Sequence, residues 1–77
     1  MQNNNKKVLL TKEGLEELQQ ELDTLKKAKR PASVARVARA RDFGDLAENA
    51  EYAAAREELA FIDGRIQELE EILKMLS

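Results

Sequence analysis

The feature that most constrains this chain is a pattern of apolar residues, spaced alternately three and four apart, that occurs in two separate stretches. We call each stretch a seam. The carboxy-terminal seam consists of Leu59, Ile62, Ile66, Leu69, Leu73 and Leu76, and the amino-terminal seam consists of Leu15, Leu18, Leu22 and Leu25. Residues spaced in this way lie along one face of an α-helix, as they do in coiled coils. Two seams separated by a turn predict an all-α fold, an antiparallel two-helix coiled-coil hairpin.

The first arm of this hairpin is expected to contain a proline break. Residues 1–10 should form a polar tail and a short extended segment, and Thr11 is a suitable N-cap for a helix over 12–29. Pro31 lacks an amide hydrogen and disfavours helical geometry in the residue before it, so the helix should break or kink near 29–32.

A shorter helix over 32–41 should complete the first arm, with Val34, Val37 and Ala38 along it. A turn at 42–44 should follow, because it contains Gly44 and separates two helical patterns. The second arm is then one long helix over 45–76 without a proline. Residues 11–77 as a whole are expected to form the hairpin.

Composition removes several kinds of chemistry. The chain of 77 residues has no cysteine and no histidine, so it lacks thiolate metal ligands and the commonest general base. No apolar run approaches the roughly 20 residues that a membrane-spanning helix needs. We therefore expect no membrane partner, no cofactor in isolation and a cytoplasmic location.

Charge is segregated along the chain, although the net charge is only −2. Residues 26–41 hold seven basic side chains and no acid, whereas residues 42–77 hold ten acids and three basic residues. The sign changes at the turn. The basic side chains of 26–41 could be solvated, or they could form salt bridges across the hairpin.

Two carboxylates, Asp45 and Glu48, lie three residues apart at the start of the expected second helix. Asp-x-x-Glu is a capping-box pattern, and both charges suit the positive end of the helix dipole. The same two carboxylates could supply oxygen ligands to Mg²⁺, provided that another molecule supplies the rest. The two interpretations are compatible, because a cap uses one oxygen of each carboxylate.

Arginines flank this acidic pair. Arg41 precedes Asp45 by four residues and Arg56 follows Glu48 by eight. They could lie on a solvated face or contact phosphate oxygens, which the arginine fork matches. The nearby rings of Phe43 and Tyr52 could stack on a base, but packing against the opposite helix is the stronger expectation.

The chain resembles the amino-terminal domain of the bacterial transcript cleavage factors GreA and GreB. The tract Gly44-Asp45-Leu46-Ala47-Glu48-Asn49-Ala50-Glu51-Tyr52 carries most of this resemblance. Further matching residues are Leu10-Thr11-Lys12-Glu13-Gly14, Leu18, Arg30-Pro31, Ala40-Arg41, Ala55-Arg56-Glu57 and Gly64-Arg65-Ile66. The resemblance covers nearly the whole chain after residue 7.

The resemblance implies an activator of RNA polymerase that is not an enzyme by itself. Family members insert a coiled coil into the secondary channel of the polymerase. There Asp45 and Glu48 would help to hold the second active-site Mg²⁺, and Arg41 and Arg56 would contact the 3′ end of backtracked RNA. The polymerase would then cleave that RNA. The family's carboxy-terminal FKBP-like domain is absent from the sequence, so the chain is either a fragment or a natural short form, and a fragment is the stronger expectation.

Other functions stay open at this stage. The same hairpin could block the polymerase channel as an inhibitor, or serve as a plain coiled-coil interaction module. Weak self-association through the exposed seam ends is also open. Specific nucleic-acid binding by the isolated chain is disfavoured, because its basic run has little aromatic interleaving and the net charge is slightly acidic.

Overall fold

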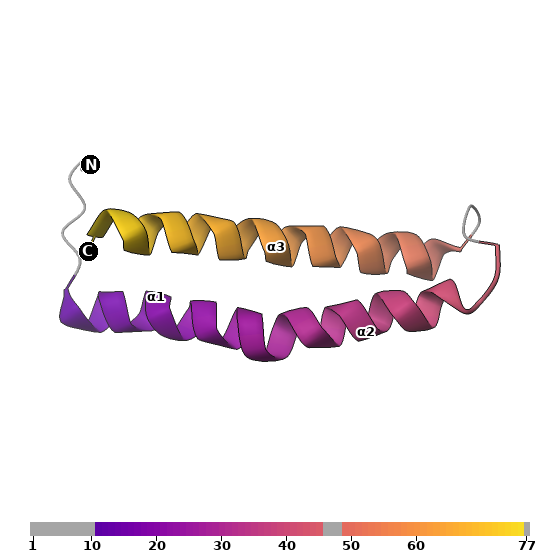
Figure 1. Cartoon of the computed structure of the whole chain (residues 1–77), viewed down its shortest axis with the longest axis horizontal. Helices are drawn as coiled ribbons and strands as arrows, with labels where there is room; N and C mark the ends of the chain where they lie inside the picture. The colour runs from indigo at the N-terminus through magenta and orange to yellow at the C-terminus, as the bar shows by residue number, and fades with distance from the viewer. Residues whose placement is uncertain (1–10, 46–48, 77) are drawn as a thin grey trace, which may run out of the picture.

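The computed structural model describes residues 11–45 and 49–76 and shows two antiparallel helical arms joined at one end (Figure 1). The first arm contains α1 (Lys12–Thr24), the π-helix η1 (Leu25–Lys29) and α2 (Arg30–Arg41). The second arm is α3 (Ala50–Leu76). The molecule measures 49 Å along its longest axis. The prediction of an all-α hairpin is confirmed.

The first helix begins at the cap that the sequence predicts. The Thr11 side-chain oxygen accepts a hydrogen bond from the backbone N–H of Gly14 at 3.0 Å. This bond satisfies one of the amide groups that a helix leaves unpaired in its first turn. Glu13 adds a negative charge near the positive end of the helix dipole.

The expected break at Pro31 is not observed, because the backbone stays helical from Lys12 to Arg41. Pro31 has no N–H to donate, and in a regular α-helix its ring would clash with the carbonyl four residues earlier. The π-helix η1 precedes it and widens the turn, so that the Arg30 N–H donates to the carbonyl of Leu25. The arm bends here and does not break (Figure 1).

The π-helix also moves the buried face of the first arm by one residue. Continued at spacings of four and three, the leucine seam that ends at Leu25 would reach positions 29, 32, 36 and 39. The buried residues of α2 are instead Ser33, Val37 and Ala40, each one position later. A π-helical turn holds one residue more than an α-helical turn. Of the three apolar residues predicted along this helix, Val37 is buried, whereas Val34 and Ala38 are exposed.

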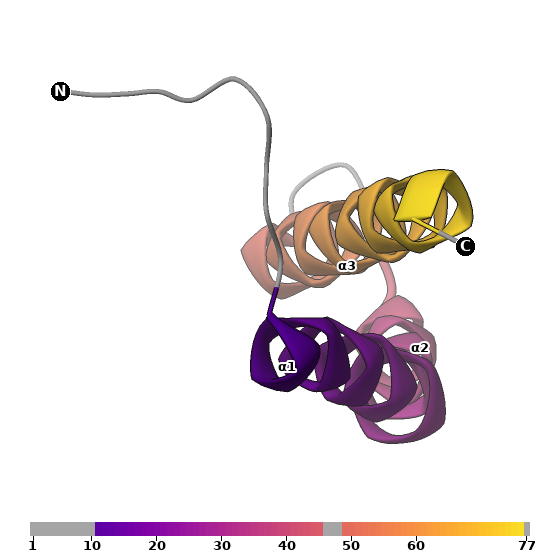
Figure 2. The same ribbon diagram turned by 90° about the vertical axis from the view of Figure 1, so that its left-hand side faces the viewer.

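The core of the hairpin is narrow. Ala55, Ile62 and Leu69 of α3 are buried at intervals of seven residues, and Leu69 is fully covered. Both α1 and α2 contact α3. Seen along the rod, α1 and α2 are displaced sideways from each other beneath α3 (Figure 2). No helix in the described ranges is long and apolar enough to cross a membrane.

Ion pairs across the hairpin account for much of the segregated charge. They join Lys26 to Glu70, Arg30 to Asp63, Arg36 to Glu51 and Glu58, and Arg65 to Glu21. Hydrogen bonds from these guanidinium groups lower the pKa of Glu21, Glu51 and Asp63 below their ordinary values. Salt bridges therefore run along most of the shaft.

Candidate functional site at the hairpin tip

The first arm ends in a tight turn after Arg41. The N–H of Phe43 donates to the carbonyl of Ala40 at 3.1 Å, and the N–H of Gly44 donates to the carbonyl of Arg41 at 3.4 Å. Gly44 has a φ of 107°, in the left-handed region that glycine adopts without a steric penalty. The chain leaves the helix direction at this glycine.

The second arm begins at Asn49, later than the sequence predicts. Its side-chain oxygen accepts a hydrogen bond from the Tyr52 N–H at 3.0 Å, and its backbone carbonyl accepts from the Ala53 N–H at 3.1 Å. Asn49 is therefore the N-cap of α3. Asp45 lies outside any helix and α3 begins at Ala50, so the helix expected over 45–76 starts later than predicted. The capping box of Asp45 with Glu48 stays a prediction, because Glu48 lies outside the described residues.

The predicted acidic pair is only partly described. Asp45 is exposed at the tip, directly after Gly44, whereas Glu48 lies outside the described residues. Carboxylate oxygens are the ligands that Mg²⁺ prefers, and exposure of Asp45 lets a metal centre approach it. Within 11–45 and 49–76, no three acidic side chains gather closely enough to hold a metal ion.

The two predicted arginines come together on one face of the hairpin. Arg41 of α2 and Arg56 of α3 line the same open hollow of about 530 Å³, together with Tyr52 and Val37. The Arg56 guanidinium lies 5.8 Å from the centroid of the Tyr52 ring, within cation–π range. This face combines two cations and the Asp63 carboxylate with a half-buried aromatic ring beside the tip.

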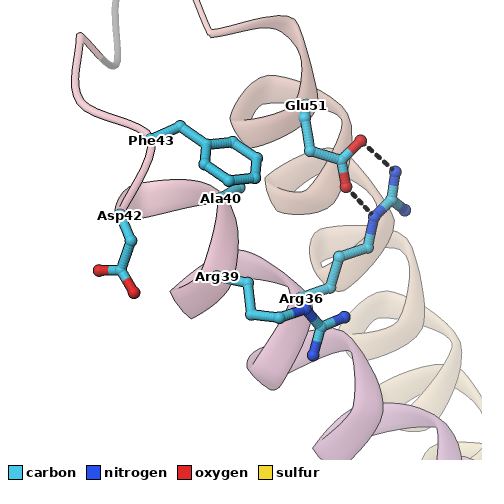
Figure 3. A pocket seen from close by; sticks show the side chains of 6 residues that line it. All are labelled: Arg36, Arg39, Ala40, Asp42, Phe43 and Glu51. Carbon is cyan, nitrogen blue, oxygen red and sulfur yellow. Dashed lines mark hydrogen bonds and ion pairs between the residues drawn. The ribbon is translucent and has the colours of Figure 1, made fainter.

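A second hollow, of about 290 Å³, lies beside the tip and is lined by Arg36, Arg39 and Phe43, among others (Figure 3). Phe43 is 71% exposed, so its expected packing against the opposite helix is not observed. Arg36 donates two hydrogen bonds to Glu51, at 2.6 and 3.1 Å, and a third to Glu58 at 2.8 Å. This arginine ties the first turns of α3 to α2.

Sequence reasoning missed Asn49 as a residue that organises the tip, whereas salt bridges across the hairpin were one of the interpretations of Arg36 and the other basic residues of 26–41. Asparagine is among the strongest N-cap residues, and Glu51 follows it in the first helical turn. That signal was available in the sequence. The Asp45-x-x-Glu48 pattern also resembles a helix start, and for that reason the sequence predicted a start earlier than Ala50.

Comparison with known proteins identifies the family of this chain. Residues 8–77 match the family described as "Transcription elongation factor, N-terminal", that of GreA and GreB. The chain is 54% identical over 69 residues to the transcription elongation factor GreA of Cereibacter sphaeroides, covering 90% of this chain and 44% of that protein.

Two further relatives come from other bacteria. GreA of Thermodesulfovibrio yellowstonii is 56% identical over 64 residues, which cover 83% of this chain and 40% of that protein. GreA of Geobacillus kaustophilus is 52% identical over 71 residues, which cover 92% and 45%. The chain thus spans less than half the length of the curated relatives it matches. It belongs to the family of the amino-terminal domain of the transcription elongation factors GreA and GreB.

Proposed function

We propose that this chain enters the secondary channel of a bacterial RNA polymerase with its tip leading and stimulates cleavage of backtracked RNA. The observation that carries the proposal is the position of Asp45, exposed beyond the ends of both arms of a narrow rod. Membership of a transcription elongation factor family supports the choice of partner. A narrow rod can bring a carboxylate into a site that a globular surface would not reach.

Asp45 and Glu48 would hold the second magnesium ion of the polymerase active centre, together with ligands that the polymerase supplies. When bound, this ion would stabilise the attacking and leaving oxygens during phosphodiester hydrolysis. Magnesium takes six ligands, so two carboxylates leave most positions to other molecules. The chain is on this account an activator of the polymerase and not a nuclease.

Arg41 and Arg56 would contact the 3′ end of the backtracked RNA. Both side chains line one hollow beside the tip, and a guanidinium fork matches the oxygens of a phosphate group. Two cations on one face would hold the RNA backbone near the carboxylates. This part of the proposal depends on the hollow that Arg41 and Arg56 line. It does not depend on the ion pairs that join the two arms along the shaft.

The direct test adds this chain to purified, backtracked polymerase complexes that carry RNA labelled at the 3′ end. The proposal expects release of a short labelled fragment and resumed elongation. A channel inhibitor would slow nucleotide addition and release no fragment, and a plain coiled-coil module would change neither. Either of these results would reject the proposal.

A further inference from the structure

The side chain of Asn49 joins the two arms at the base of the tip. Its amide nitrogen donates to the carbonyl of Ala40, in the last turn of α2, at 2.6 Å. Its amide oxygen accepts from the Tyr52 N–H, in the first turn of α3, at 3.0 Å. One half-buried side chain therefore bonds the end of one helix and the beginning of the next.

The chemistry of these two bonds calls for an amide. A backbone carbonyl can only accept a hydrogen bond and a backbone N–H can only donate one. The asparagine amide offers a donor and an acceptor on separate atoms, so it serves both partners at once. Aspartate would keep the acceptor toward Tyr52 but would place an oxygen against the oxygen of Ala40. Serine would keep a capping oxygen and lose the amide donor.

The anchor points on both sides are themselves well held. Ala40 is 1% exposed, and its carbonyl also accepts the Phe43 N–H at 3.1 Å, which closes the end of α2. Arg36 pairs with Glu51 and holds the first turn of α3 against α2 (Figure 3). The segment between Ala40 and Asn49 thus starts and finishes at fixed points, and Asp45 lies within it.

We propose that Asn49 is a positioning residue for the tip. By bonding Ala40 and Tyr52 together, it sets the separation of the two ends of the segment that carries Asp45, and so limits where that carboxylate can lie. Asn49 acts through these partners and contacts neither RNA nor metal. The inference rests on the proposed function, because a carboxylate needs a fixed place only if it joins a metal centre of strict geometry.

The test compares Asn49→Asp and Asn49→Ser with Thr11→Ala, which removes a helix cap at the opposite end of the rod. Fragment release from backtracked complexes is measured at saturating chain over a range of magnesium concentrations. Polymerase affinity, helicity and amide hydrogen exchange at residues 42–44 are measured in parallel. The neutral serine variant separates the lost donor from the added charge of aspartate.

Both Asn49 variants should cleave about 10- to 100-fold more slowly, because misplacement by about 1 Å has effects of this size. They should need more magnesium for half-maximal cleavage, and amides 42–44 should exchange faster, with polymerase affinity unchanged. Thr11→Ala should match the unmodified chain in all these measurements except helicity.

Unchanged cleavage and exchange in both Asn49 variants would overturn the inference. A loss of cleavage fully explained by an equal loss of helicity or of polymerase binding would overturn it too. In that case Asn49 would only stabilise the fold. If the unmodified chain releases no fragment, the proposed function fails instead. The hydrogen-exchange measurement would still decide whether Asn49 restrains the tip.

Discussion

Individual side chains at the tip divide into those that fasten the turn and those that face outward. Asn49 and Arg36 make directed bonds between the arms. Asp45 and Arg56 are exposed. Asp45 precedes Asn49 in the sequence and Arg56 follows it. Residues of the first kind set geometry, and we assign chemistry to those of the second kind.

At this scale we expect Arg56→Gln to weaken RNA contact without unfolding the hairpin. Losing one charge-assisted hydrogen bond to phosphate should lower fragment release about tenfold at limiting chain. The measurement is the dependence of fragment release on chain concentration. Lys12→Gln, an exposed cation at the far end of the rod, is the matched control. An Arg56→Gln curve that overlays the control would remove Arg56 from the RNA contacts.

Residue types and their spacing predicted part of this site. They placed Arg41 and Arg56 on either side of the acidic pair in the sequence, and in the structure both line one hollow, whereas their contact with RNA stays a prediction. They did not predict that Asn49 caps α3. Two N-cap candidates four residues apart compete on local grounds. The bond from Asn49 to Ala40, on the other arm, favours one of them and is invisible to local patterns.

Among the elements, η1 has the largest effect on the packing of the hairpin. It adds one residue to the turn before Pro31, and the buried stripe of α2 becomes Ser33, Val37 and Ala40. Without that extra residue, positions 32, 36 and 39 would face α3, and two of them are arginines. The π-helix therefore keeps small and apolar side chains in the core and leaves Arg36 at its edge.

This interpretation predicts how two deletions act, the first of them in a Pro31→Ala background, where the proline no longer demands a widened turn. Deleting Ala28 shortens η1 by one residue and should give a regular α-helix that still buries Val37 and Ala40. Deleting Ala35 in the chain that keeps Pro31, and with it the widened turn, should turn Val37 and Ala40 away from α3. We expect thermal unfolding by circular dichroism to show a clearly larger loss of Tm, relative to its own parent chain, for the second deletion. Equal losses of Tm would show that η1 does not set the register.

Hydrophobic spacing predicted the helices and most of α3's buried face, because each seam reports local geometry directly. It did not predict the path through Pro31. Proline excludes a regular α-helical turn, but a break and a π-helix both satisfy that restriction. Which one forms depends on the side chains that must face the other arm, which lie 25 residues away in the pair Ser33–Glu58 and 33 residues away in the pair Arg30–Asp63.

For the whole molecule, separation of charge between the arms favours antiparallel pairing. Arg30 and Arg36 of the first arm meet carboxylates of α3, and Arg65 of α3 meets Glu21 of α1. If one arm were shifted along the other, the oppositely charged side chains would be too far apart to pair. Guanidinium groups would then lie beside apolar side chains. Exposed pairs contribute modestly one by one and are screened by salt. Together these pairs fix how the two arms align, and they contribute less to the free energy of unfolding of the hairpin.

Stability of the hairpin should therefore fall in acid. Glu21, Glu51 and Asp63 have folded-state pKa values below their ordinary values of 4.5, 4.5 and 3.8. Below those ordinary values the unfolded chain binds more protons, so the contribution is complete near neutral pH and is lost as pH falls through the folded values. Tm should be level near neutral pH and fall below about pH 4.5. Glu21→Gln should fall less steeply, and a Tm independent of pH down to about pH 3 would contradict this account.

The central claim is that the tip lends carboxylates to a metal centre that belongs to the polymerase. The most direct measurement is fragment release from backtracked complexes by the double variant Asp45→Asn, Glu48→Gln, with polymerase binding measured on the same samples. The account predicts normal binding, with fragment release reduced to the rate of polymerase alone. Fragment release at the rate of the unmodified chain would contradict it.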